Sequence, residues 1–263
     1  MKPKRSWRPP RRKKNTSVDL PIGSEEVEFG IPIAGKILPQ EMWTHCALKK
    51  LPESRPVDWN EVFSRQAPLV VDIGCGNGRY TIASAIARPE LNHLALDALP
   101  MVIRYGTRRA NQRGLQHCKF AVVDGWRFLS ELCDEESIAE MHIYHPQPYA
   151  DPKDISKRML NPEFMGLMFR KLALNARVYL QTDRQPYWDY ITRWMPKLFQ
   201  WEEVPGDWAD EPTFRSRREI LARKEGLKIH RGIGIKTENR NTSEVSALVA
   251  TMEQPTFTIE YDC

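Results

Sequence analysis

The alternation of short apolar runs with longer helical segments from Pro68 onward restricts the fold of this chain most strongly. Apolar runs of strand length occur at 68–73, 91–97, 119–123, 139–144 and 177–182. Segments with the apolar spacing of helices follow them, at 79–88, 101–113, 126–133, 161–174 and 186–199. Each strand is thus separated from the next by a helix, which is the pattern of repeated β-α-β units. The sequence predicts an α/β fold with a mostly parallel sheet and helices on both faces.

A glycine-rich turn follows the first predicted strand. Residues 71–78 read Val-Asp-Ile-Gly-Cys-Gly-Asn-Gly, so Asp72 and then three alternate glycines precede the first helix. Glycine permits positive φ and a close approach of backbone to ligand. At this point of an open sheet, such a turn forms a nucleotide-sized crevice beside the topological switch point. We expect Gly74 and Gly76 to contact the ligand there, and Asp72 to suit a cationic group of it.

Acidic residues also end the second and third predicted strands. Asp97 lies about 20 residues beyond the turn, where an acidic side chain can bind both ribose hydroxyls. Asp124 ends the third strand, where an adenine amino group would lie. Each of these residues alone is commonly a turn former or a helix N-cap. Together with the glycines they resemble the S-adenosylmethionine site of the Rossmann-like class I methyltransferases, which makes S-adenosylmethionine the expected cofactor.

The second half of the chain resembles a particular methyltransferase family. It reads Ile-Tyr-His-Pro-Gln-Pro at 143–148, Asn-Pro-Glu-Phe at 161–164, Thr-Asp-Arg-Gln-Pro-Tyr at 182–187 and Ser-Arg-Arg-Glu at 216–219. These segments are similar to the Phe-Pro-Asp-Pro-Trp-Pro, Asn-Pro-x-Phe, Thr-Asp-x-x-x-Tyr and Thr-x-x-Glu motifs of the tRNA (guanine-N7)-methyltransferases. The resemblance covers roughly residues 58–235. It implies methylation of N7 of a variable-loop guanosine in tRNA.

The chain departs from this family at the central motif. His145 stands where the family has an aspartate, and Gln147 where it has a tryptophan. In the family, that aspartate is thought to hold the target guanine or the transferring methyl group. Asp151, in the loop that follows, could supply the missing acid from a shifted register. The candidate catalytic residues are therefore His145, Asp151 and Asp183.

Methylation of guanine N7 needs alignment more than acid–base chemistry. N7 carries a lone pair and no proton, and the product purine is cationic, so nearby negative charge favours the reaction. A carboxylate can also accept the N1–H and amino donors of guanine, which selects guanine over adenine. The resemblance implies that Asp183 and Glu219 recognise the base, with Thr182 and Ser216 as hydroxyl partners.

Basic residues on either side of these motifs are expected to contact RNA phosphates. They are Lys153, Lys157, Arg158, Arg215, Arg217 and Arg218. Residues 1–14 add eight Lys and Arg and no acidic residue. Removing these eight from the 39 Lys and Arg of the chain leaves 31, against 34 Asp and Glu. The net charge of +5 therefore comes from the N-terminus, which we interpret as a disordered basic tail over residues 1–17, either an arm for RNA or only a solvated segment.

The pattern of apolar residues and the composition indicate how the rest of the chain is organised. We expect an N-terminal extension at 18–60 that packs partly on the domain, a methyltransferase domain at 61–236, and a C-terminal tail or appended segment at 237–263. The five cysteines form no CxxC pair, so neither a metal site nor a disulfide framework is expected. Cysteines that stay reduced favour a cytoplasmic location. No apolar stretch approaches the roughly 18 residues of a membrane span, so no membrane partner is expected.

Two other functions stay open at this point. His145 is compatible with a diverged RNA-binding protein that keeps the cofactor fold without N7 transfer. A methyltransferase with a changed nucleobase or a small-molecule substrate is the second alternative. The intact glycine turn favours an enzyme over a protein that only binds RNA.

The basic N-terminus leads to a first prediction. Deleting residues 1–14 should weaken tRNA binding and flatten its dependence on salt, because each phosphate that a basic side chain neutralises releases counterions. The measurement is tRNA affinity at several salt concentrations for the full-length and truncated proteins. Equal salt slopes would show that this segment does not touch RNA.

Overall fold

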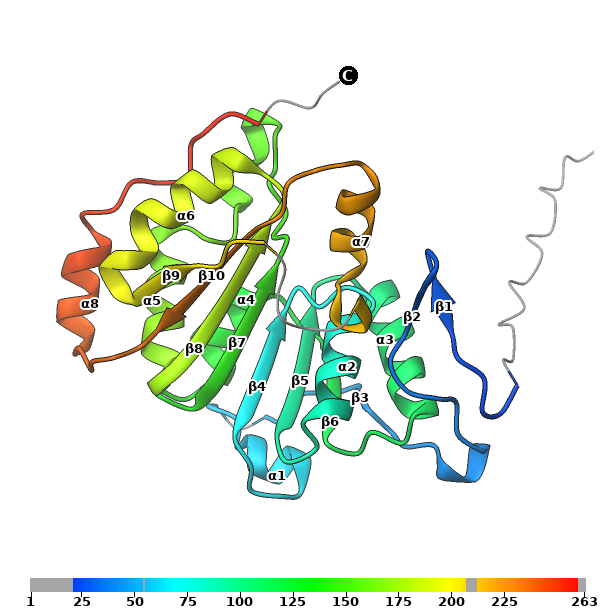
Figure 1. Cartoon of the computed structure of the whole chain (residues 1–263). Helices are drawn as coiled ribbons and strands as arrows, with labels where there is room; N and C mark the ends of the chain where they lie inside the picture. The colour runs from blue at the N-terminus through cyan, green and yellow to red at the C-terminus, as the bar shows by residue number, and fades with distance from the viewer. Residues whose placement is uncertain (1–20, 54, 207–211, 260–263) are drawn as a thin grey trace, which may run out of the picture.

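The computed structural model describes residues 21–53, 55–206 and 212–259, so the predicted basic tail lies outside the described residues. Its centre is an eight-stranded sheet with the order β3-β6-β5-β4-β7-β8-β10-β9 (Figure 1). The strands, in sheet order, are Ala47–Leu48, Cys118–Val122, Asn92–Asp97, Leu69–Ile73, Ile138–Tyr144, Leu172–Thr182, His230–Ile235 and Gln200–Glu203. All pairs from β3 to β8 are parallel, and only β10 runs antiparallel to its neighbours. The predicted fold class is confirmed.

Helices cover both faces of the sheet (Figure 1). The α-helices are α1 Trp59–Phe63, α2 Arg79–Ala87, α3 Pro100–Gln112, α4 Gly125–Arg127, α5 Pro162–Lys171, α6 Gln185–Leu198, α7 Arg217–Lys224 and α8 Thr242–Val249. Successive residues of β5 show the two cores that result. Leu94 and Leu96 pack in the cluster that includes α5 and α6, whereas Ala95 packs with α2 and α3. Burial on both faces explains why the strands read as continuous apolar runs.

The start of α5 matches its sequence signals, but its end does not. The Asn161 side chain accepts the N–H of Phe164 at 2.9 Å, as expected for an N-cap. The predicted helix at 161–174 stops at Lys171, because Leu172 begins strand β8 and pairs with Ile138. Leu172 is fully buried in the larger core. Packing and strand pairing therefore override the helical period over the last three residues.

The N-terminal extension contains a hairpin and an edge strand. Strands β1 (Val27–Glu28) and β2 (Ile31–Pro32) pair antiparallel, and β3 adds to the edge of the main sheet beside β6. Strands of two residues carry too few side chains to show a period, so the sequence predicted only irregular structure here. No helix of the described residues has both the length and the apolar character that crossing a membrane requires.

The C-terminal segment, predicted as a tail or appended segment, includes helix α8. This helix packs on α5, where a Cβ at Gly166 would lie 2.8 Å from a methyl carbon of Val249. Asn241 and Glu244 form a capping box at its start, with each side chain accepting the other residue's backbone N–H. The Asn-x-x-Glu spacing is the signal that announces such a helix in a sequence.

This cap generates a stability prediction. Asn241→Ala should lower the free energy of unfolding by about 1 kcal/mol, since an N-cap side chain satisfies an otherwise free helix N–H. Denaturant unfolding measures the change, and Ser246→Ala on the exposed surface of the same helix is the control. Cofactor affinity should not change. An unfolding energy equal to that of the control would show that α8 is not coupled to the fold.

Candidate active site

A cavity of about 490 Å³ opens at the carboxyl ends of β4, β5, β6 and β7, beside the point where the strand order reverses. Such edges are where open α/β sheets bind ligands. The cavity is lined by Ile73, Gly74, Asp97, Ala98, Leu99, Val123, Asp124, Gly125, Tyr144, His145, Pro146, Gln147, Tyr149 and Met159. Its walls are thus three strand-end segments on one side and the loop after β7 on the other. We call residues 145–149 the β7 loop.

The glycine turn forms one wall and is hydrogen-bonded to the neighbouring strand. Gly74 and Cys75 donate their N–H groups to the Leu96 carbonyl at 2.8 and 2.9 Å. Gly74, Gly76 and Gly78 all have positive φ, at 77°, 54° and 76°. Nothing lies within 4 Å of a Cβ built on Gly74, so its backbone is open to a ligand. The turn therefore needs glycine for its backbone conformation, and it presents bare backbone to the cavity.

Asp97 and Asp124 line the same cavity. The Asp97 carboxylate accepts the N–H groups of Gly76 at 3.0 Å and Leu99 at 2.9 Å, so it closes the end of the turn. Asp124 is the N-cap of α4 and accepts the Arg127 N–H at 2.9 Å. Both carboxylates keep lone pairs beyond these bonds. The structure brings together Gly74, Asp97 and Asp124, which the sequence assigned to the cofactor.

Asp72 is placed differently from the expectation. Its side chain is 3% exposed, accepts the Thr81 hydroxyl at 2.5 Å, and does not line the cavity. Burial raises the pKa of Asp72 to about 7, against the lowering effect of the Thr81 hydrogen bond. The carboxyl therefore does not face this cavity, and its contact with a cationic ligand group stays a prediction. Gly76 also lies outside the cavity lining, and it acts through its hydrogen bond to Asp97.

His145 and Asp183 form a buried pair behind the cavity wall. His145 Nδ1 lies 2.7 Å from Asp183 Oδ1, and Nε2 lies 2.9 Å from the Gln181 amide nitrogen. Because an ionised carboxylate can only accept, Nδ1 donates to Asp183. Arg218, from α7, donates to the other Asp183 oxygen at 2.5 Å. Burial alone would raise the pKa of Asp183, but the bonds from His145 and Arg218 hold it well below its ordinary value.

This arrangement changes the expected roles of both residues. The side chains of His145 and Asp183 are only 2% and 4% exposed. His145 belongs to the wall of the cavity, but both of its ring nitrogens are used inside the protein. Asp183 does not line the cavity at all. Asp183 therefore lies one side chain away from this cavity, behind His145.

The other predicted base-binding residues point into the protein. Glu219 is 3% exposed and accepts hydrogen bonds from Arg223 at 3.0 Å and from Arg231 at 2.8 Å. The Ser216 hydroxyl caps α7, and the Thr182 hydroxyl accepts the backbone N–H of residue 184 at 3.2 Å. None of the three lines the cavity. In this structure they fix α7 and the end of β8, and their part in guanine recognition stays a prediction.

Arg158, which was also expected to contact RNA phosphates, is buried. Its side chain is 1% exposed and donates to the carbonyls of Pro148, Tyr149, Pro255 and Phe257, at 2.5 to 2.9 Å. It thereby ties the β7 loop to the C-terminal segment. Lys157 is exposed and paired with Asp154, so it stays accessible to RNA. Asp151 caps the turn at 152–157, pairs with Lys153 and does not line the cavity, so its role in place of the family aspartate stays a prediction.

Sequence reasoning missed two residues that do line the cavity, Gln147 and Tyr149. Gln147 is exposed, and within the described part of the chain its amide makes no hydrogen bond. Tyr149 and His145 both have positive φ, at 41° and 53°, which is costly for residues with a side chain. The replacements at His145 and Gln147 were the signals of this wall in the sequence. Among the described residues, no group of three or more His, Cys, Asp or Glu side chains is arranged to hold a metal ion.

Comparison with known proteins places the chain in a family. The family described as "Putative methyltransferase" matches residues 66–236. The chain belongs to this methyltransferase family. The resemblance found in the sequence is also confirmed by relatives named tRNA (guanine-N(7)-)-methyltransferase. One from Saccharophagus degradans is 26% identical over 70% of this chain and 81% of its own length, and one from Rubrobacter xylanophilus is 28% identical over 65% and 78%.

Solved structures support the fold. The 16S rRNA methyltransferase KamB aligns with a TM-score of 0.55 at 14% identity, over 74% of this chain and 99% of that one. The 16S rRNA (adenine(1408)-N(1))-methyltransferase from Catenulisporales acidiphilia aligns with a TM-score of 0.52 at 14% identity, over 76% and 98%. These likenesses confirm the class I methyltransferase fold.

The buried Asp72 generates a pH prediction. Its pKa of about 7 exceeds the ordinary value of 3.8, so the folded state binds this proton more tightly than the unfolded state. The stability that Asp72 contributes is thus complete below about pH 4 and is lost as the pH rises to about 7. Asp72→Asn should remove this loss. The change in the free energy of unfolding from pH 4 to pH 7 should therefore be more favourable in the variant than in wild type, by roughly 1–4 kcal/mol.

Denaturant unfolding of both proteins at pH 4, 5.5 and 7 measures the effect. Other carboxyls titrate in the same range, so the informative quantity is the difference between variant and wild type at each pH. A difference that does not change with pH would contradict a protonated, buried Asp72.

Proposed function

We propose that this protein transfers the methyl group of S-adenosylmethionine to N7 of a variable-loop guanosine in tRNA. The observation that carries the proposal is the cavity at the switch point. Gly74, Asp97 and Asp124 line one side of it and the β7 loop lines the other. The relatives named tRNA (guanine-N(7)-)-methyltransferase support the reaction and the substrate. A tRNA partner and a cytoplasmic location are parts of this proposal.

The residues on the cofactor side fit S-adenosylmethionine. Asp97 would accept the ribose hydroxyls, and Asp124 would accept the adenine amino group, because both keep free lone pairs at the cavity. The open space at Gly74 leaves room for the ligand against bare backbone. The volume of about 490 Å³ falls in the range of small-molecule sites, roughly 300–1,000 Å³. When bound, this cofactor supplies an electrophilic methyl group on a sulfonium.

The β7 loop faces the place where a target base would enter. Its shape is held from behind by Asp183 and Gln181 at His145, and by Arg158 at Pro148 and Tyr149. Held in this way, the loop presents the free amide of Gln147 to the cavity. An amide can accept from guanine N1–H or the amino group and donate to O6. We therefore propose Gln147 for recognition of the base, in place of the carboxylates that the sequence suggested.

Methylation of N7 requires the protein mainly to place the guanine relative to the methyl group. N7 has no proton to remove, so the work of the site is to hold the base in line with the methyl group. The buried Asp183 stays ionised, and its charge lies one imidazole away from the cavity, where it favours the cationic product. The positive charge of Arg218 offsets part of the negative charge of Asp183, so the electrostatic effect of Asp183 on the product is moderate. The N7 reaction is compatible with a histidine at position 145 for this reason.

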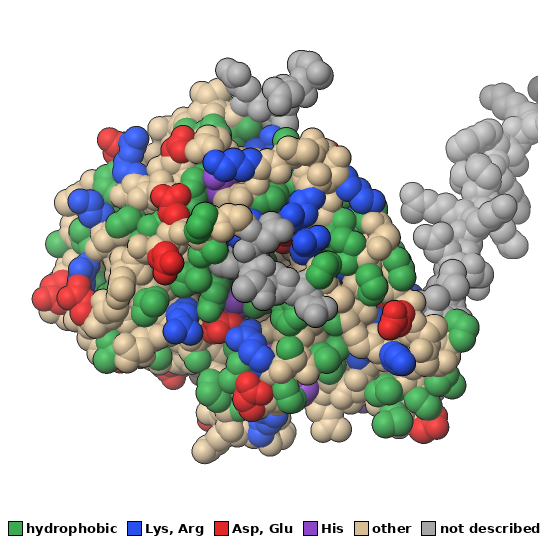
Figure 2. All heavy atoms as spheres, viewed as in Figure 1, with side chains coloured by type: hydrophobic (Ala, Val, Ile, Leu, Met, Phe, Trp, Pro, Cys, Tyr) green, Lys and Arg blue, Asp and Glu red, His purple; other side chains and the backbone are tan. Residues whose placement is uncertain are grey.

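Basic side chains beside the site suit an RNA substrate. Lys and Arg side chains gather over α7 on the face shown in Figure 2, and Arg217, Arg218, Arg223 and Lys224 belong to this helix. Lys157 is exposed on the loop that follows the cavity wall. The diverged-binder alternative is not favoured, because Gly74, Asp97 and Asp124 all keep their places at the cavity.

The test of this function is methyl transfer from labelled S-adenosylmethionine to total tRNA, followed by nucleoside analysis. We expect labelled N7-methylguanosine. A protein that binds cofactor and tRNA but forms no N7-methylguanosine on any tRNA would contradict the proposal. A different labelled nucleoside would point to a changed target base.

The Asp183 pair generates a kinetic prediction. Asp183→Asn should lower kcat by roughly 10²-fold, because it removes the buried charge behind the wall and leaves Arg218 with Glu225 as its ion-pair partner. Cofactor affinity should change little, since Asp183 does not line the cavity. His145→Ala should reduce kcat less, because Asp183 keeps its charge. Steady-state kinetics give both values, and Asp189→Asn on the exposed side of α6 is the matched control. A normal kcat for Asp183→Asn would exclude any role in the transfer.

A further inference from the structure

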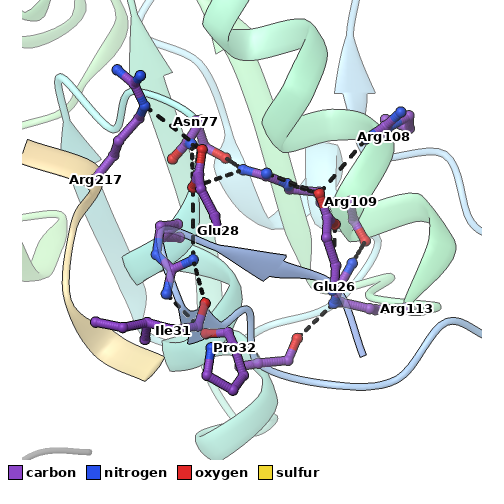
Figure 3. Close-up of polar contacts among 11 residues, drawn as sticks. Glu26, Glu28, Ile31, Pro32, Asn77, Arg108, Arg109, Arg113 and Arg217 are labelled. Carbon is purple, nitrogen blue, oxygen red and sulfur yellow. Dashed lines mark hydrogen bonds and ion pairs between the residues drawn. The ribbon is translucent and has the colours of Figure 1, made fainter. Parts of the chain in front are cut away.

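The β1–β2 hairpin brings two glutamates into a group of arginines beside the glycine turn (Figure 3). Glu26 lies 2.9 Å from Arg109 and 3.7 Å from both Arg108 and Arg113. Glu28 lies within 3.7 Å of Arg79, Arg109 and Arg217. The two side chains therefore share Arg109 and the same kind of partner. Their other arginine partners differ, and Glu28 also contacts the glycine turn.

Glu28 alone of the two holds the turn itself. Both of its oxygens accept from the Asn77 side-chain amide, at 3.0 and 2.9 Å. The Asn77 carbonyl accepts from Arg109 at 3.4 Å, so this residue is held at both ends. Asn77 is 8% exposed and lies between Gly76 and Gly78, which both have positive φ. Because glycines on either side leave the backbone free to adopt other conformations, the shape of the turn depends on what holds Asn77.

The contact continues toward the cofactor cavity. Gly76, the neighbour of Asn77, donates its N–H to Asp97 at 3.0 Å, and Asp97 lines the cavity. The hairpin that carries Glu28 is in turn fixed, because the buried Arg79 donates to the carbonyls of Ile31 and Pro32. A continuous set of bonds thus runs from the hairpin through Glu28 and Asn77 to the carboxylate assigned to the ribose.

Glu28 also touches the helix on the other side. Its partner Arg217 precedes Arg218, which pairs with Asp183. A second cavity, of about 540 Å³, lies between these elements and is lined in part by Glu28, Asn77, Arg109, Arg217 and Arg218. Glu28 therefore stands where the glycine turn, α3 and α7 meet.

We infer that Glu28 is a positioning residue for the cofactor, acting through Asn77 on the glycine turn. The inference rests on the proposed function only in that the ligand is S-adenosylmethionine. It makes the N-terminal hairpin a working part of the site, although the family match begins at residue 66. A charge-assisted bond of this kind is among the stronger hydrogen bonds in proteins.

The first test compares the two glutamates by cofactor binding without RNA. Calorimetry with S-adenosylhomocysteine should show an affinity about tenfold weaker for Glu28→Ala, which loses both bonds to Asn77. Glu28→Gln should lose less, because its amide oxygen still accepts from Asn77. Glu26→Ala is the matched control. It removes a carboxylate that shares Arg109 with Glu28 but makes no bond to Asn77, so its melting temperature should fall while its affinity stays within about twofold of wild type.

The second test exchanges donor and acceptor across the contact. Asn77→Asp places two carboxylates face to face and should weaken binding at least as much as Glu28→Ala. Adding Glu28→Gln should restore much of the affinity, because the amide then donates from residue 28 and the carboxylate accepts at residue 77. A residue with only a structural role would not show this recovery. If Glu28→Ala does not fold, Asn77→Ala tests the same bond and leaves the ion pairs of Glu28 in place.

The outcomes separate this inference from the proposed function. Wild-type affinity in Glu28→Ala, or no recovery in the double variant, overturns the inference even if the wild type forms N7-methylguanosine. Conversely, a wild type that binds S-adenosylhomocysteine but methylates no tRNA overturns the function, while the binding series still decides the role of Glu28.

Discussion

The attachment of the glycine turn to the end of β5 is the interaction on which the rest of the site depends. Two N–H groups of the turn share the Leu96 carbonyl, and a third, from Gly76, is accepted by Asp97. These bonds fix the turn to the strand whose last residue faces the cavity. Because β4, β5 and β6 are parallel, their carboxyl ends meet at one edge of the sheet. Asp124 lies at this edge because it closely follows β6. The cofactor half of the site is thus a direct consequence of sheet topology.

That dependence on topology explains which parts of the site the sequence could predict. Strand ends, the glycine spacing and the N-cap at Asn161 are local patterns, and each was found where it was expected. The partners of buried charges are not local. Glu219 is satisfied by Arg231 across the α7–β10 connection, and Arg158 by carbonyls almost a hundred residues away. A sequence shows that such residues are charged but not that they are buried, so their motif positions suggested substrate contacts that the fold uses internally.

The exchange of an aspartate for His145 removes one carboxylate of the family motif, but the carboxylate of Asp183 remains directly behind the imidazole. The imidazole fills the wall and donates to Asp183, and the carboxylate is held ionised behind it by Arg218. An enzyme that needed a proton acceptor at this point would lose its base through such a change. Methylation at N7 needs no base, so alignment by the β7 loop can carry more of the reaction. Gln147, which replaces a family tryptophan, is then the exposed polar group on the base side.

The two walls of the cavity are each tied to a part of the chain outside the family match at 66–236. On the base side, Arg158 binds carbonyls of the β7 loop and of residues 255 and 257 with one guanidinium, and it packs on the Phe257 ring at 3.9 Å. On the cofactor side, Glu28 of the hairpin holds Asn77 of the glycine turn. Arg158 and Glu28 are both charged, and each binds polar groups of a cavity wall without lining the cavity itself. Loops of positive φ gain a single shape only when their surroundings determine it. Here the surroundings include the two terminal segments. The two walls of the cavity therefore depend in part on residues that lie outside the family match.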